Sequence, residues 1–166
     1  MERLTELLKQ VSRQIEDPKK GLPEEIFLFA TEITPMVNVD LLIRDEDGSI
    51  LLSWRDDQFY GKGWHVPGGI LRLKESFEER IQKTALNEIG CKVYSADRPL
   101  EIVPIVVNEM KTRGHFITFV YECKLPDGVA INNGMKTETD AGYLAWHKKC
   151  PNNILDVHKF YRKYFI

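Results

Sequence analysis

Hydrophobic and polar positions follow one another along this chain with two different periods. The first stretch has apolar residues three and four positions apart, which predicts a helix that ends before Pro18. Its apolar stripe consists of Leu4, Leu7, Leu8, Val11 and Ile15. We expect this helix to form an N-terminal extension over residues 1–20 and to pack on the domain or on a partner.

Strand-like patterns follow the extension. Residues 25–33 are β-prone and predict a strand or an interface segment. Residues 37–43 and 50–55 are mostly apolar and flank a polar turn, in which Asp47 and Gly48 supply the turn chemistry of a hairpin. Further strand-like runs are residues 100–110, 115–125 and 143–147.

Two more helices are predicted, one in the middle and one at the end of the chain. Ser76 and Glu79 form a capping-box pattern that starts a helix, and Gly90 suits its end. From Pro151 a closing helix is indicated by the spacing of Ile154, Val157, Phe160 and Tyr164. Strands interleaved with helices predict an α/β fold over residues 21–166, with a mixed sheet between helices.

Composition narrows the class of protein. A chain of 166 residues with 43% hydrophobic residues can build one sizeable core, and its net charge of −2 is spread without a basic block. We therefore expect no nucleic-acid partner. Its three cysteines are far apart and form no CxxC pair, which indicates reduced thiols in the cytoplasm. Since no apolar run approaches membrane-spanning length, we expect no membrane partner.

A carboxylate interrupts the apolar face of the middle helix. At 100° per residue, Glu88 falls within about 60° of Phe77, Ile81 and Thr84. A carboxylate on a packed face needs hydrogen-bond donors, a cation or a metal, unless it turns to water or pairs with an arginine. The Pro-Gly-Gly sequence at 67–69 favours a cation site, because glycines let the backbone approach a cation and a phosphate closely.

Residues 69–91 resemble the Nudix box. From Gly69 the chain has five residues, Glu75, seven residues and then KTALNEIGC, where the family pattern is Arg-Glu-apolar-x-Glu-Glu-x-Gly-apolar. Matching positions are Gly69, Glu75, Ala85, Glu88, Gly90 and Cys91. Three positions depart from the family pattern: Lys83 replaces the arginine, and Thr84 and Asn87 replace two glutamates. The family binds two or three divalent cations on its glutamates. These replacements argue against a multi-metal cluster.

Residues 34–91 are also similar to the GDP-mannose mannosyl hydrolase branch of this family, through TPMVNVDLLI, a hairpin that ends in Arg55, and GWHVPGG. Such enzymes are α/β/α sandwiches that hold one Mg²⁺ ion and release a nucleoside diphosphate by attack at the sugar carbon. The resemblance implies that Glu88 and the carbonyl of Gly68 bind Mg²⁺, or alternatively Mn²⁺. It further implies that Arg55 binds the diphosphate and that Asp40 orders the substrate site. Lys83 takes the place of the box arginine. It keeps the positive charge but lacks the guanidinium group that can bind a carboxylate through two N–H donors.

The loop before the last strand departs from that branch. It has the sequence KTETDAGYLAW and lacks the glutamine and catalytic-base histidine that the branch places there. Asp140 or its neighbour Glu138 can supply a metal ligand or a base instead. Trp64 and Tyr60 flank Arg55 and can stack on a base or a sugar, or serve ordinary packing.

Together these features predict a Nudix hydrolase that cleaves a nucleotide sugar and releases a nucleoside diphosphate. One alternative is a pyrophosphohydrolase that acts on ADP-ribose-like compounds or nucleoside triphosphates, with Glu138 or Asp140 completing the metal site. A second alternative is a catalytically weak module that binds a nucleotide. We expect a small-molecule nucleotide as the partner, and the N-terminal stripe suggests a homodimer.

Overall fold

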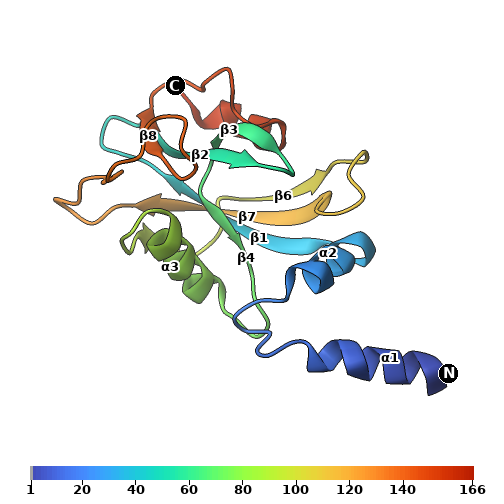
Figure 1. Cartoon of the computed structure of the whole chain (residues 1–166). Helices are drawn as coiled ribbons and strands as arrows, with labels where there is room; N and C mark the ends of the chain where they lie inside the picture. The colour runs from blue at the N-terminus through green and yellow to red at the C-terminus, as the bar shows by residue number, and fades with distance from the viewer. Residues whose placement is uncertain (1) are drawn as a thin grey trace.

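The computed structural model describes residues 2–166, which form two sheets, three α-helices and a closing 3-10 helix (Figure 1). The helices are α1 Glu2–Arg13, α2 Glu24–Ile33, α3 Phe77–Glu88 and the 3-10 helix η1 Asp156–Tyr164. The strands are β1 Met36–Ile43, β2 Ile50–Asp57, β3 Gly61–His65, β4 Gly68–Ile70, β5 Tyr94–Ser95, β6 Glu101–Val106, β7 His115–Lys124 and β8 Leu144–His147.

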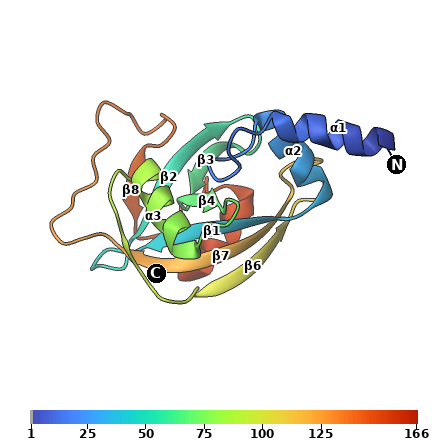
Figure 2. The same ribbon diagram turned by 90° about the horizontal axis from the view of Figure 1, so that it is seen from below.

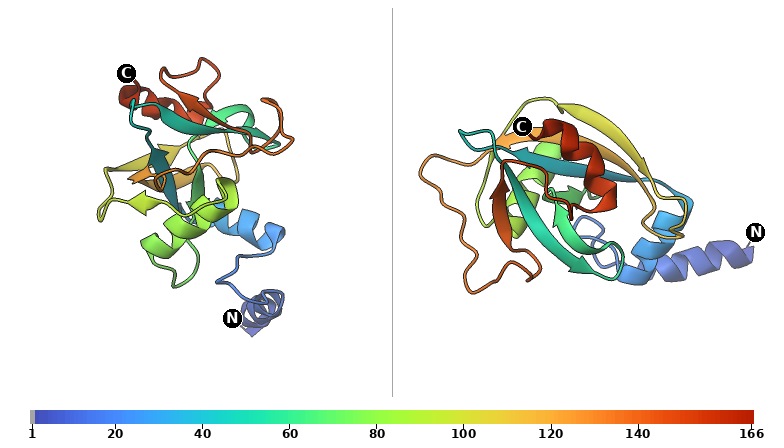
Figure 3. Two further views of the ribbon diagram at one scale, coloured as in Figure 1. Left: turned by 90° about the vertical axis from the view of Figure 1, so that its left-hand side faces the viewer. Right: turned by 90° about the horizontal axis from the view of Figure 1, so that it is seen from above.

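The larger sheet is mixed. Its strands lie in the order β4-β1-β7-β5, and β6 also pairs with β7. β1 runs parallel to β7, whereas the other pairs of this sheet are antiparallel. The smaller sheet, in the order β3-β2-β8, is antiparallel. α3 covers one face of the larger sheet, and the smaller sheet lies with η1 over the other (Figures 1 and 3). The predicted α/β sandwich with a mixed sheet is confirmed.

Alternation along β1 divides the core into two layers. Val39, Leu41 and Ile43 pack in the same buried cluster as residues of α3, whereas Leu42 packs with Tyr161 of η1. Because successive side chains of a strand point to opposite faces, Asp40 shares the face of Leu42. β1 therefore carries a carboxylate into the layer between the two sheets.

The middle helix starts and ends where the sequence predicts. Ser76 accepts from the backbone of Glu79, whose side chain accepts from the Ser76 backbone in return, so the capping box is present. At the other end Gly90 has φ +88°, a conformation that glycine adopts readily. α3 therefore holds Glu88 in its last turn.

Two predictions about the first half of the domain are wrong. Residues 25–33 belong to helix α2, not to a strand; Glu24 and Glu25 occupy its first turn, where negative charge is favourable. β1 and β2 do not form a hairpin, because they belong to different sheets and are joined only by a bridge between Arg44 and Ile50. The turn itself is as predicted, with Gly48 at φ +80°.

The two ends of the chain differ in their packing. The closing helix begins at Asp156, later than the predicted start at Pro151, and is of the 3-10 type. Two of the three predicted apolar intervals, from Ile154 to Val157 and from Val157 to Phe160, have the three-residue spacing of such a helix. α1 has no buried residue, so its apolar stripe is not covered by the rest of the chain (Figure 2). Within residues 2–166 no helix is long and apolar enough to cross a membrane. The predicted homodimer and the cytoplasmic location remain predictions.

Candidate active site

The two glycines of the Pro-Gly-Gly turn are required by space. β4 pairs with β1 so that Gly68 lies opposite Asp40. A Cβ atom at Gly68 would lie 2.1 Å from an Asp40 carboxylate oxygen, and one at Gly69 would lie 2.4 Å from the Thr84 hydroxyl of α3. Any larger residue at either position would therefore displace a side chain of the site. The glycines let β4 lie between the carboxylate of β1 and the box helix.

The backbone of Gly68 faces away from β1. Leu41 donates to the carbonyl of Pro67, and Leu71 donates to the carbonyl of Val37. Because ladder bonds alternate along an antiparallel pair, the N–H and carbonyl of Gly68 both point outward from the edge strand β4. The outward N–H group meets the carboxylate of Glu88. The carbonyl of Gly68 is thus available on the side where Glu88 lies.

Glu88 is the carboxylate of the box that lies at this edge. Its oxygen Oε2 is buried without a hydrogen-bond partner and lies 3.6 Å from Nε2 of His65. Burial raises the pKa of Glu88 to about 7, although the charge of Arg55 and the N–H of Gly68 oppose the rise. A buried, incompletely satisfied carboxylate oxygen is what a bound cation would compensate.

Asp40 is held by two short hydrogen bonds. Tyr161 donates its hydroxyl to Oδ2 and Asn38 donates its amide to Oδ1, each at 2.6 Å. Burial is the largest effect on this group and raises the pKa of Asp40 to about 7. These contacts fix the carboxyl group against Gly68 and join β1 to η1.

Two neutral histidines line the interior of the site. Val66 donates its N–H to Nδ1 of His158 at 3.2 Å, and the rings of His65 and His158 meet edge to face at 5.8 Å. Burial lowers the pKa of His65 to about 3, and it lowers that of His158 well below its usual value. Both imidazoles are therefore uncharged near neutral pH.

Arg55 stands where two cavities meet. It extends from β2, forms an ion pair with Asp57 at 3.4 Å and lies 5.6 Å from the ring of Tyr60. One cavity, of about 210 Å³, is lined by residues that include Asp40, Gly68 and Tyr60. The other, of about 300 Å³, is lined by Glu88 and by the loop around residues 136–142. Arg55 and His65 line both cavities. Arg55 therefore offers a positive charge to both cavities.

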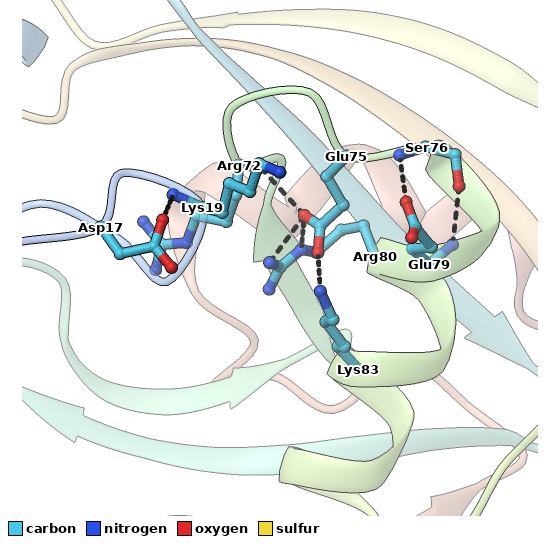
Figure 4. A network of polar contacts seen from close by, with 8 residues as sticks. All are labelled: Asp17, Lys19, Arg72, Glu75, Ser76, Glu79, Arg80 and Lys83. Carbon is cyan, nitrogen blue, oxygen red and sulfur yellow. Dashed lines mark hydrogen bonds and ion pairs between the residues drawn. The ribbon is translucent and has the colours of Figure 1, made fainter.

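Glu75 braces the loop between β4 and α3 (Figure 4). It accepts the backbone N–H of Arg72 at 3.0 Å and Nε of Arg80 at 2.7 Å. It also pairs with Nη2 of Arg80 at 2.7 Å and with Nζ of Lys83 at 2.8 Å. Arg80 thus contacts Glu75 through two guanidinium nitrogens, which the single ammonium group of Lys83 cannot do. Lys83 is more than half exposed and lines neither cavity, so its position favours bracing over contact with a substrate.

Two other expected site residues lie apart from the cavities. Trp64 is buried against Trp54 and His147 and lines neither cavity, which favours packing over the predicted stacking on a substrate. Asp140 is exposed and accepts hydrogen bonds from the backbone and hydroxyl of Thr137. It would have to release these bonds to bind a metal. Its neighbour Ala141 lines the second cavity.

The box offers fewer carboxylates than a multi-metal cluster uses. Among residues 2–166 no group of three or more His, Cys, Asp or Glu side chains is arranged to hold a metal. Thr84 and Asn87 occupy the positions of two box glutamates, and the Thr84 hydroxyl is buried without a partner. Glu88 and the carbonyl of Gly68 are the oxygen ligands that remain, and oxygen ligands are those that Mg²⁺ prefers.

Several residues of the site carried no usable signal in the sequence. His158, Tyr161 and Arg113 come from segments far from the box, and only the fold brings them to it. Arg80 lies within the box, but its side chain reaches Glu75 only because α3 begins at Phe77.

Comparisons with known proteins identify the family of this chain. The chain is 31% identical over 85 residues to the "Low-salt glycan biosynthesis protein Agl8" of Haloferax volcanii, a match over 51% of this chain. The chain spans 54% of the length of that curated relative.

Solved structures share the fold. The MutT NUDIX hydrolase of Burkholderia pseudomallei has a TM-score of 0.59 at 18% identity, covering 80% of this chain and 99% of that one. A UDP-X diphosphatase has a TM-score of 0.56 at 22% identity, covering 95% of this chain and 73% of that one. The family model for the NUDIX domain matches residues 34–156, which is well over half of the sequence. The chain therefore belongs to the NUDIX domain family of hydrolases.

Proposed function

We propose that the protein hydrolyses a nucleotide sugar and releases a nucleoside diphosphate, with one Mg²⁺ ion, or alternatively Mn²⁺, at Glu88 and Gly68. The supporting observation is the unpartnered oxygen of Glu88 beside the outward backbone of Gly68, at a site whose other box glutamates are replaced. A bound Mg²⁺ ion would neutralise charge on a departing diphosphate.

Arg55 binds the diphosphate in this proposal. Its guanidinium lines both cavities, so a diphosphate beside it would leave the nucleoside in one cavity and the sugar in the other. An arginine also stabilises the charge that grows on a leaving diphosphate.

Asp40 and the histidines set the shape of the site. Asp40, fixed by Tyr161 and Asn38, orders the wall of the first cavity against which the substrate lies. His65 lies 3.6 Å from Glu88, but the lowering of its pKa to about 3 by burial makes it a weak proton acceptor near neutral pH. Asp140 can accept a proton from water if its loop rearranges. Lys83 acts by holding Glu75.

The relatives support this proposal over its alternatives to different degrees. The matched segment of the Haloferax protein belongs to a protein named for glycan biosynthesis, which favours a sugar nucleotide. The structure named UDP-X diphosphatase supports the alternative in which water attacks phosphorus. A binding module without catalysis would keep the same fold and the same cavities.

A panel of nucleotide sugars tests the proposal. Hydrolysis should need Mg²⁺ and should fall at least about a hundredfold in Glu88→Gln, on the scale of other lost charge-stabilising groups. The matched control is Glu78→Gln, which removes an exposed carboxylate from the first turn of the same helix. A panel without turnover, or equal rates for Glu88→Gln and the control, would contradict the proposal. A nucleotide that raises the melting temperature without being consumed would support the binding module instead.

A further inference from the structure

Arg113 lies in the first cavity at a wall that the box does not build. It belongs to the loop between β6 and β7, beside α2, whereas Glu88 ends α3 on the other side of the molecule (Figures 1 and 2). Its backbone N–H donates to the hydroxyl of Thr31 on α2 at 2.9 Å. Its carbonyl accepts from the hydroxyl of Tyr60 at 2.8 Å. Two separate elements thus fix the backbone of Arg113.

Three aromatic rings hold the side chain of Arg113. The centre of its guanidinium lies 4.6 Å from the ring of Phe59, 5.4 Å from that of Phe27 and 5.8 Å from that of Tyr60. These rings come from α2 and from the turn between β2 and β3. Rings at such distances attract a cation, but they do not neutralise its charge.

The backbone conformation at Arg113 is unfavourable. Its φ is +56°, a region that residues other than glycine rarely adopt and that persists where surrounding contacts enforce it. The next residue is Gly114, and glycine adopts a positive φ without strain. The strained conformation nevertheless falls on the arginine. Arg113, held in this conformation, is one of the residues that line the cavity.

The charge of Arg113 has no partner of opposite sign in the structure. Of the arginines that line the first cavity, Arg55 pairs with Asp57 and Arg80 with Glu75. Arg113 and Arg72 form no ion pair with any residue between 2 and 166, and Nε of Arg113 is buried without a hydrogen-bond partner.

The remaining polar groups of this cavity do not supply the missing charge. Asp40 is occupied by Tyr161 and Asn38. Thr118, which lies opposite Asn38 on β7, is fully buried and its hydroxyl has no partner. A ligand with both hydroxyl groups and a negative charge would satisfy these unpaired groups.

We propose that Arg113 forms a second anion subsite, which binds a carboxylate or phosphate group attached to the part of the substrate remote from the diphosphate. The inference rests on the proposed function for the placement of the diphosphate at Arg55, and it narrows the substrate class to nucleotides with an extra anionic group. Arg113 is then a residue that determines specificity.

Two matched ligand pairs test the subsite and distinguish the source of the anion. UDP-glucuronate and UDP-glucose differ by a sugar carboxylate, whereas ADP-ribose 2′-phosphate and ADP-ribose differ by a phosphate. Dissociation constants are measured by calorimetry on the full chain with EDTA present, so that no ligand is consumed. In at least one pair the member with the extra carboxylate or phosphate should bind roughly tenfold tighter, which is the scale of one charge-assisted hydrogen bond.

The preference should depend on Arg113 alone. In Arg113→Gln the ratio of the two dissociation constants within the pair should fall to about 1. The affinity for the member without the extra anionic group should change less than about threefold, which excludes a folding defect. Lys111→Gln is the control, because it removes a charge from the same loop that pairs with Glu32 and lines neither cavity. Its ratio should equal that of the unmodified protein.

The outcomes separate this inference from the proposed function. A ratio near 1 in both pairs, no binding of any of the four ligands at millimolar concentration, or an unchanged ratio in Arg113→Gln would overturn the subsite. A preference that Arg113→Gln removes would support the subsite even if no nucleotide sugar is hydrolysed, and in that case the proposed function alone fails.

Discussion

Replacing Arg80 tests whether it, and not Lys83, stabilises the loop that precedes the box helix. The side chain of Glu75 is only 3% exposed and receives two of its hydrogen bonds or ion pairs from Arg80. Lys83 supplies one contact from a side chain that is 55% exposed (Figure 4). Arg80→Met and Lys83→Met keep the aliphatic part of each side chain and remove the charge.

The expected costs follow from burial. Removing one partner of a buried ion pair costs roughly 3–5 kcal/mol, because the remaining charge is left without compensation. Lys83 and the N–H of Arg72 still contact Glu75, so we expect about 3 kcal/mol for Arg80→Met. An exposed ion pair contributes up to about 1 kcal/mol, which is the limit for Lys83→Met. For a chain of this size the melting temperature should fall by roughly 6–12 °C in Arg80→Met and by less than about 4 °C in Lys83→Met.

Thermal and urea unfolding at pH 7.5 and moderate salt measure both variants. Equal destabilisation by the two substitutions, or a larger loss for Lys83→Met, would refute the stabilising role assigned to Arg80. Hydrolysis by Lys83→Met adds a second test. A rate close to that of the unmodified protein would support the bracing role, and a rate as low as that of Glu88→Gln would restore a direct role for Lys83.

Three further substitutions test the interior of the site. Because the folded pKa of Asp40, about 7, lies above its ordinary value of 3.8, its protonated form stabilises the fold below pH 4, and this stability is lost as the pH rises through 7. Without metal, Asp40→Asn should remove up to about 4 kcal/mol of the decrease in unfolding free energy between pH 4 and pH 8, measured in urea; an unchanged pH dependence would contradict the raised pKa. Gly69→Ala should destabilise the protein by about 1–3 kcal/mol, because the new methyl group meets the Thr84 hydroxyl. Adding Thr84→Ala should recover part of that loss, and simple additivity of the two costs would show that the clash is absent.

Local patterns predicted the middle of the fold well. The capping box at Ser76 and the glycine at Gly90 bound α3 correctly, because both signals act within one turn of the chain. The same reasoning assigned residues 25–33 to a strand or an interface segment, although they belong to helix α2. There the contacts of Thr31 and Phe27 with Arg113, which are distant in sequence, accompany a conformation that β-propensity does not favour.

The candidate site was only partly visible in the sequence. Helical periodicity placed Glu88 on a packed face, and its burial beside His65 agrees with that inference. The contact of Asp40 with Tyr161 was not predictable, because Tyr161 lies 121 residues away and reaches Asp40 only through the packing of η1 on the sheet. Stacking by Trp64 was inferred from its place near Arg55, but strand alternation directs Trp64 into the core.

The most direct test of the proposed chemistry is hydrolysis of a nucleotide sugar in ¹⁸O-labelled water, followed by mass spectrometry of the products. Attack at the sugar carbon predicts an unlabelled nucleoside diphosphate and a sugar that carries the label. Attack at phosphorus would instead give a nucleoside monophosphate and a sugar phosphate, one of which carries the label. The first result supports the proposed attack at the sugar carbon, and the second contradicts the proposed release of a nucleoside diphosphate.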